Sequence, residues 1–135
     1  MSDADKSVNR ADITEPAVLI RVPHAFRPGM SDLELYEATR GVWKIGSRRE
    51  QVRYAFAVVD GEVREAYQID RWQPAHKSVY ITRTLDPGGA QGRWECAGRP
   101  APDAIRNRYV GRSVAHYFKK SAQNPIMYVN LDERL

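Results

Sequence analysis

The chain has 135 residues, of which 42% are hydrophobic and 28% charged, the size and composition of one globular domain with its own core. No apolar run approaches the roughly eighteen residues that a membrane helix needs, and the single cysteine, Cys96, excludes an internal disulfide and a cysteine zinc cluster. The polar, acidic start (MSDADKSVNRADITEP) lacks the basic-then-apolar pattern of a secretory signal. We therefore expect a cytoplasmic protein that contacts no membrane.

The positive charge of the chain is concentrated in one segment. Residues 93–120 carry seven Lys and Arg against two Asp and Glu, a net charge of +5, whereas residues 1–35 have a net charge of −2. Clustered positive charge concentrates polyanions electrostatically. For a chain whose formal net charge is only +4, a solvated basic face that maintains solubility is an equally open interpretation.

The chain begins with a segment that has no structural pattern. Residues 1–15 are polar and aperiodic, so they are expected to form a flexible N-terminal tail before a single domain over residues 16–135. The apolar, branched run at residues 17–22 (AVLIRV) predicts a buried strand, which two prolines and a glycine then end.

Residues 31–41 (SDLELYEATRG) predict a short helix. Ser31 followed by Glu34 is the pattern of a capping box at the start of a helix. Arg40 lies in the last turn, where positive charge is favoured, and Gly41 fits the left-handed position that follows many helices.

The clearest unit follows a brief predicted strand at residues 42–45 (VWKI) and a loop at residues 47–51 (SRREQ). Two strand-like runs flank Asp60-Gly61, a strong signal for a β-hairpin. Both faces of residues 54–59 are apolar, so this strand should be central in a sheet. The second strand alternates apolar and charged residues, which places one of its faces in water.

Five further elements are expected in the order strand, strand, helix, helix, strand, and they cover residues 79–82, 93–98, 101–111, 113–120 and 125–130. Strands dominate this order, and neighbouring strands can pair antiparallel. The sequence therefore predicts an α+β fold, a small and mostly antiparallel β-barrel or curved sheet with a few short peripheral helices.

A family resemblance agrees with this architecture. The helix ending in Arg-Gly, the tryptophan-bearing strand GVWKIG and the hairpin YAFAVVDGEVREAYQIDRW together resemble the PUA-like superfamily, which includes the ASCH, EVE and YTH domains. The resemblance covers about residues 17–98 and rests on strand order and hairpin style. It implies a compact β-barrel that presents a pocket or groove to RNA or to modified bases.

Aromatic and basic residues are interleaved in this chain, as in proteins that bind nucleic acid. Basic side chains contact phosphates, and aromatic rings give stacking platforms for bases. We therefore expect a binding surface for RNA or DNA, plain or modified, with a pocket that reads a flipped base. The candidate contacts are Tyr36, Thr39, Arg40, Trp43, Arg48, Arg49, Trp72, Arg108, Arg112, Ser113, His116, Lys119, Lys120 and Asn124. The competing interpretation makes the rings core fillers and the arginines solvated.

Two other classes of function stay open. A small nuclease could use His116 with Lys119 or Lys120 for acid–base cleavage, and Ser113 would share their face if the segment is helical. A protein-interaction module is the other. The three scattered histidines and one cysteine show no metal-ligand spacing, and no glycine-rich nucleotide loop is present, so we expect neither a metal nor a cofactor.

Overall fold

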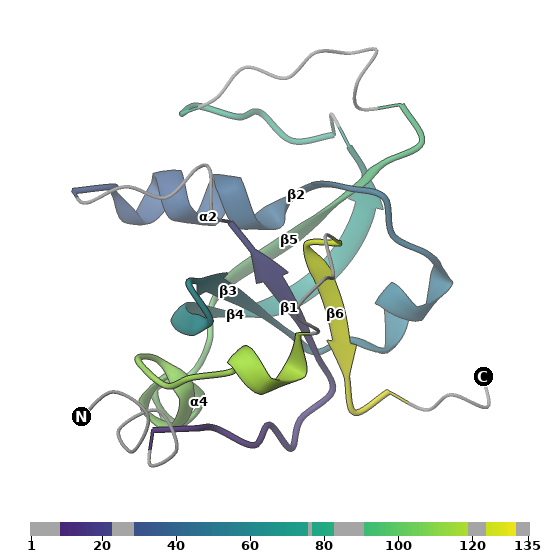
Figure 1. Cartoon of the computed structure of the whole chain (residues 1–135). Coiled ribbons are helices and arrows are strands. Elements are labelled where there is room, and N and C mark those ends of the chain that lie inside the picture. Colours follow the sequence, from purple (N-terminus) through teal and green to yellow (C-terminus); the bar gives the residue numbers. More distant parts are fainter. Residues whose placement is uncertain (1–8, 23–28, 76, 83–90, 119–123, 132–135) are drawn as a thin grey trace.

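The computed structural model of the chain describes residues 9–22, 29–75, 77–82, 91–118 and 124–131 (Figure 1). It is a small α+β domain, as predicted, built on one six-stranded sheet. The strands are β1 (Ala17–Arg21), β2 (Gly41–Trp43), β3 (Tyr54–Val59), β4 (Glu62–Pro74), β5 (Trp94–Pro100) and β6 (Ile126–Val129). The helices are α2 (Asp32–Arg40) and α4 (Asp103–Tyr109), with two short 3-10 helices, η1 (Ser47–Gln51) and η2 (Ala115–Tyr117).

The sheet curls into a half-barrel rather than a closed barrel. Its strand order is β2-β5-β4-β3-β1-β6, and the two edge strands, β2 and β6, do not pair with each other. Four of the neighbouring pairs are antiparallel, but β1 pairs parallel with β3, with Leu19 opposite Phe56. A parallel pair needs a long crossover, which the chain makes through α2, β2 and η1. The prediction of a closed barrel is therefore wrong, whereas the curved sheet and its mostly antiparallel character are confirmed.

Strand β3 is central and buried on both faces, as its sequence predicted. All six of its residues are buried. Phe56 and Val58 face one apolar cluster, which α4 covers, and Ala55 and Val59 face a second cluster on the side of α2. The hairpin turn after it is also confirmed, because Asp60 and Gly61 have φ angles of 51° and 77°, both positive as a type I′ turn requires.

Helix α2 begins as predicted but ends differently. The Ser31 hydroxyl accepts a hydrogen bond from the Glu34 backbone N–H, and the Glu34 carboxylate accepts one from the Ser31 N–H, both at 3.1 Å. Gly41 is extended, with φ −175°, so it is not a left-handed cap. A glycine is needed there because a Cβ would lie 2.9 Å from the Cβ of Glu95 and 2.8 Å from the hydroxyl of Tyr80.

Residues 9–15, which the sequence analysis assigned to the tail, pack against the domain. Ala11 and Ile13 are 0% and 4% exposed and belong to the apolar cluster under α4. The Ala11 N–H donates to the Ser113 carbonyl at 2.8 Å. The first eight residues lie outside the described part of the chain.

Two other predicted elements differ from the structure. Within the described part of the helix expected over residues 113–120, only the three residues of η2 are helical, and Ser113 forms isolated β-bridges with Arg10 and Glu62. Residues 79–82 form no strand.

Candidate nucleic-acid interface

The helix η1 places two predicted arginines on aromatic rings that the sequence analysis did not select. The guanidinium carbon of Arg49 lies 3.5 Å from the centre of the Trp94 ring, and that of Arg48 lies 4.7 Å from the Tyr128 ring. Arg49 is also 3.2 Å from the Glu50 carboxylate, whereas Arg48 makes no ion pair within the described residues. Trp94 and Tyr128 lie in predicted strands. The arrangement of the sheet brings both rings next to η1.

A cationic pocket of about 440 Å³ opens on one side of η1. It brings together Arg48 and Asn124, two predicted contacts that are far apart in the sequence, and adds Lys44. Its remaining lining comes from Ile45, Gly46, Ile126, Met127 and Tyr128. Lys44, Arg48 and Asn124 are exposed, so two positive charges and an amide face the solvent at its rim.

Tyr128 carries an unsatisfied group in this pocket. Its hydroxyl is buried and has no hydrogen-bond partner within the described part of the chain. Burial raises the pKa of Tyr128, and the neighbouring Arg48 and Arg49 only partly oppose that rise. The hydroxyl is therefore a neutral donor close to two cations, which suits a ligand that carries an acceptor or a negative charge.

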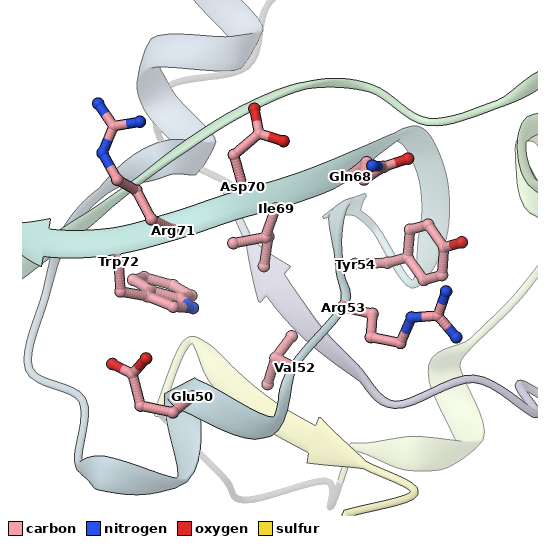
Figure 2. Close-up of a pocket in the computed structure, with 9 residues that line it drawn as sticks. All are labelled: Glu50, Val52, Arg53, Tyr54, Gln68, Ile69, Asp70, Arg71 and Trp72. Atoms are coloured by element: carbon pink, nitrogen blue, oxygen red, sulfur yellow. The ribbon is translucent and has the colours of Figure 1, made fainter.

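A second pocket, of about 280 Å³, lies between η1 and β4 and is called the Trp72 pocket (Figure 2). Strand β4 continues past the start of β3, and the chain before β3 diverges from it, which opens the space. The pocket is lined by Glu50, Val52, Arg53, Tyr54, Gln68, Ile69, Asp70, Arg71 and Trp72. The indole Nε1 of Trp72 is buried and has no hydrogen-bond partner among the described residues.

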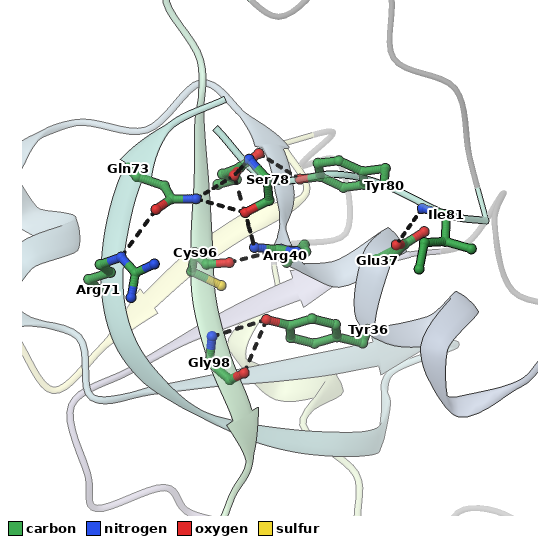
Figure 3. Close-up of polar contacts among 11 residues, drawn as sticks. Tyr36, Glu37, Arg40, Arg71, Gln73, Ser78, Tyr80, Ile81, Cys96 and Gly98 are labelled. Atoms are coloured by element: carbon green, nitrogen blue, oxygen red, sulfur yellow. Dashed lines mark hydrogen bonds and ion pairs between the residues drawn. The ribbon is translucent and has the colours of Figure 1, made fainter. Parts of the chain in front are cut away.

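Arg40, by contrast, is an interior residue (Figure 3). It is 8% exposed, and its guanidinium donates to the Cys96 carbonyl at 3.0 Å and to the Ser78 hydroxyl at 2.7 Å. It also lies between the rings of Tyr36 and Tyr80, at 5.0 and 5.2 Å from their centres. Arg40 is therefore engaged on every side by the protein.

Two buried carboxylates complete this interior network. Glu95 accepts hydrogen bonds from the Gln73 amide, the Ser78 N–H and the Tyr80 hydroxyl, and Glu37 accepts from the N–H groups of residues 81 and 82. Burial would raise the pKa of each, but these donors outweigh it and hold both pKa values below the ordinary one. The carboxylates thus fix residues 78–82 beside α2, where a strand ladder was expected.

The other predicted residues of α2 and β2 also serve the fold. The Tyr36 hydroxyl both donates to the Gly98 carbonyl and accepts from its N–H, at 3.1 and 3.0 Å. Thr39 is 1% exposed. The Trp43 indole donates to the Thr39 carbonyl at 2.8 Å and packs against an apolar cluster. The geometry gives these three residues internal partners and does not bring them to the η1 pockets.

The basic segment around α4 is also engaged internally. We call Arg106, Arg108, Tyr109 and Arg112 the α4 cluster. The Arg106 guanidinium donates to both oxygens of Glu65, at 2.7 and 2.9 Å, and Arg108 donates to Glu15 at 2.6 Å. Arg112 donates to the backbone carbonyls of residues 10 and 108. Figure 1 separates α4 from η1, which lies on the opposite side of the view.

His116 has an acidic partner that the sequence analysis missed. Its Nε2 lies 3.5 Å from the carboxylate of Asp12, and its ring packs on Tyr117 at 4.3 Å between centres. Burial, followed by the charge of Arg10, lowers the pKa of His116. Asp12 was missed because it was assigned to the flexible tail. Lys119 and Lys120 lie outside the described residues, and Ser113 interacts with the backbone N–H of Ala115 at 3.4 Å.

No protein-family model, curated protein or solved structure matches the chain, so its chemistry is argued from its own geometry. In the described part of the chain no helix has the length and apolar character to cross a membrane. No group of three His, Cys, Asp or Glu side chains is placed to hold a metal ion among those residues either. Cys96 is a buried free thiol, and burial raises its pKa to about 12.

Proposed function

We propose that the protein binds single-stranded nucleic acid along η1, with a backbone phosphate in the cationic pocket. The observation that carries the proposal is the convergence of Lys44, Arg48 and Asn124 on a pocket that is also lined by Tyr128, whose buried hydroxyl has no partner among the described residues. An ammonium, a guanidinium and a hydroxyl are three donors of the kind that phosphate oxygens accept.

The state of the two cations supports this choice of site. Lys44 and Arg48 are exposed and make no ion pair among the described residues, so a phosphate meets no competing carboxylate. Arg48 lies over the Tyr128 ring, which restrains the guanidinium without neutralising it. Asn124 uses its side-chain oxygen on the Ile126 N–H at 3.0 Å, which leaves the amide N–H groups for a ligand.

A base next to the bound phosphate could enter the Trp72 pocket. The helix η1 lines the cationic pocket with Arg48 and the Trp72 pocket with Glu50, two residues further on. A strand that runs along η1 can therefore leave a phosphate in the first pocket and turn an unpaired base into the second. This arrangement requires a single strand, because bases in a duplex are stacked and paired.

The test is a salt series of binding to single-stranded RNA and single-stranded DNA. The double variant Lys44→Gln/Arg48→Gln should bind about tenfold to a hundredfold more weakly and lower the slope of log K against log salt by about 0.7, the value for one lost phosphate contact on a single strand. A matched control, Arg64→Gln/Lys77→Gln, removes the same charge outside the pocket and should keep the parental slope. Equal slopes for the two double variants would overturn the proposed site.

A hydrolase is the second candidate, and the Asp12–His116 pair is the observation that favours it. A carboxylate beside an imidazole orients it and can support acid–base cleavage. The binding reactions should therefore be examined for cleavage products. Cleavage that His116→Ala abolishes would establish this candidate, and cleavage unchanged in His116→Ala would remove it.

A further inference from the structure

The Trp72 pocket contains a buried donor that the fold does not use. Trp72 is 9% exposed, and its Nε1 has no hydrogen-bond partner among the described residues. Figure 2 shows the indole nitrogen turned toward the middle of the pocket, between Ile69 and Val52. A buried N–H without a partner lowers stability, because its hydrogen bond to water is lost in folding and not replaced. A ligand with an acceptor at its inner edge would satisfy this group.

The other side chains define what else the ligand must present. Figure 2 places the Glu50 carboxylate beside the Trp72 indole, on the same side of β4, whereas Asp70 and Arg71 turn to the opposite side. Glu50 is 63% exposed in its side chain, and one oxygen lies 3.2 Å from Arg49. The walls are apolar at Val52 and Ile69. The pocket therefore offers one N–H donor next to a carboxylate that can accept two donors, between apolar walls.

Guanine is the common base whose edge matches this order. Its O6 is an acceptor, and the neighbouring N1–H and N2–H₂ groups are two adjacent donors that a carboxylate accepts together. Adenine and cytosine have no pair of adjacent donor groups beside an acceptor, and uracil and thymine have a single N–H on that edge. A planar purine also fits the volume of about 280 Å³, with Val52 and Ile69 as apolar contacts in a lining that is otherwise mostly polar.

We propose that the Trp72 pocket binds an unpaired guanine, with O6 accepting from Trp72 Nε1 and with N1–H and N2–H₂ donating to Glu50. The inference rests on the proposed function for the strand that delivers the base, with its phosphate in the cationic pocket. It adds a sequence preference: strands that carry an accessible guanine bind more tightly than strands that lack one.

Free nucleosides separate this inference from the proposed function, because they carry no phosphate. We would titrate ¹⁵N-labelled protein with guanosine and with inosine, which lacks only the 2-amino group. The chain has three tryptophans, so three indole N–H signals are expected, and Trp72→Phe identifies the one that belongs to Trp72. Guanosine should shift that signal, and inosine should bind about tenfold more weakly because one charge-assisted hydrogen bond is lost.

Two carboxylate variants complete the test. Glu50→Gln should remove most of the difference between guanosine and inosine, whereas Glu62→Gln, the same change at the hairpin, should retain it. Equal affinity for guanosine, inosine and uridine, no shift of the Trp72 signal with guanosine, or an unchanged preference in Glu50→Gln would each overturn the guanine site. Loss of salt-dependent binding in Lys44→Gln/Arg48→Gln with an intact guanosine shift would show that the two sites are independent.

Discussion

The α4 cluster and the η1 region are both rich in arginine, but they differ in whether their polar groups have hydrogen-bond or ion-pair partners within the protein. Around α4, Arg106 and Arg108 pair with carboxylates, and the Tyr109 hydroxyl donates to Glu15 at 2.6 Å while it accepts from the Thr14 N–H at 3.2 Å. Around η1, both arginines lie on aromatic rings and only Arg49 also has a carboxylate partner, Glu50, while the Tyr128 hydroxyl and the Trp72 indole have no partner within the described residues.

This contrast indicates where a ligand would be accepted. A charge that already has a carboxylate partner gains little from a phosphate, because the existing pair must first be broken and both groups rehydrated. Arg48 lies on a ring and has no carboxylate partner among the described residues, so an anion meets its positive charge without breaking an ion pair. The +5 segment that dominates the sequence is therefore the weaker candidate surface, and the smaller basic group around η1 is the stronger one.

The largest expected effect on stability comes from a comparison of two tyrosine hydroxyls, those of Tyr109 and Tyr128. Tyr109→Phe should lower the free energy of unfolding by about 1–3 kcal/mol, because it leaves the Glu15 carboxylate and the Thr14 N–H without their partner. Tyr128→Phe removes a buried hydroxyl that has no partner, so the free energy of unfolding should stay within about 0.5 kcal/mol of the parent or rise. Urea unfolding measures both.

Binding gives the opposite order for the same pair of variants. Tyr128→Phe should weaken nucleic-acid binding, whereas Tyr109→Phe should leave it unchanged at a temperature where both variants are folded. If Tyr109→Phe impairs binding and Tyr128→Phe does not, the α4 cluster is the interface and the contrast drawn above is reversed.

Protonation of Glu15 at acid pH is expected to lower the free energy of unfolding by an intermediate amount. Burial tends to raise the pKa of Glu15, but hydrogen bonds from the Tyr109 hydroxyl, the backbone N–H of Glu15 itself and the Thr14 side chain, with the charge of Arg108, together hold it below the ordinary value. A lowered pKa in the folded state means that ionised Glu15 stabilises the protein at neutral pH. This contribution is lost as the pH falls from about 4.3, the pKa of an unperturbed glutamate, through the folded value.

The measurement is the free energy of unfolding between pH 7 and pH 3 for the parent and for Glu15→Gln. The parent should lose more stability than the variant over this interval, although both carry the other titrating carboxylates, Glu37 and Glu95. Parallel pH profiles would mean that the Glu15 contacts do not favour the ionised form.

Much of the fold follows from local sequence patterns. The central position of β3, the Asp60-Gly61 turn and the capping box of α2 each depend on residues that are close together in the chain, and the sequence predicted all three. The errors concern long-range partners. Residues 79–82 have a strand-like composition, but the carboxylate of Glu37, more than forty positions away, takes their backbone N–H groups. Nothing local indicates such a partner.

The same reason explains which site residues could be predicted. Arg48, Arg49, Trp72 and Asn124 were selected by residue type. Arg48 and Asn124 line the cationic pocket and Trp72 lines the second pocket, whereas Arg49 lies on the Trp94 ring and lines neither. Arg40 was selected by the same criterion, yet it is buried beside Glu95. Tyr128 was not selected at all. Residue type indicates what a side chain can bind, but the partner that already occupies it depends on the sheet order, which the sequence did not predict.

The smallest expected effect lies within η1 itself and separates its two arginines. Arg49→Gln should lower the free energy of unfolding by about 0.5–1 kcal/mol, because its guanidinium lies only 3.5 Å from the Trp94 ring centre and its side chain is 14% exposed. Arg48→Gln should change it by less than about 0.5 kcal/mol, since Arg48 is exposed. Its effect should instead appear in the salt dependence of binding. Equal losses of stability in both variants would mean that Arg48 is held as a structural residue, and the cationic pocket would then lose the residue that most favours a phosphate.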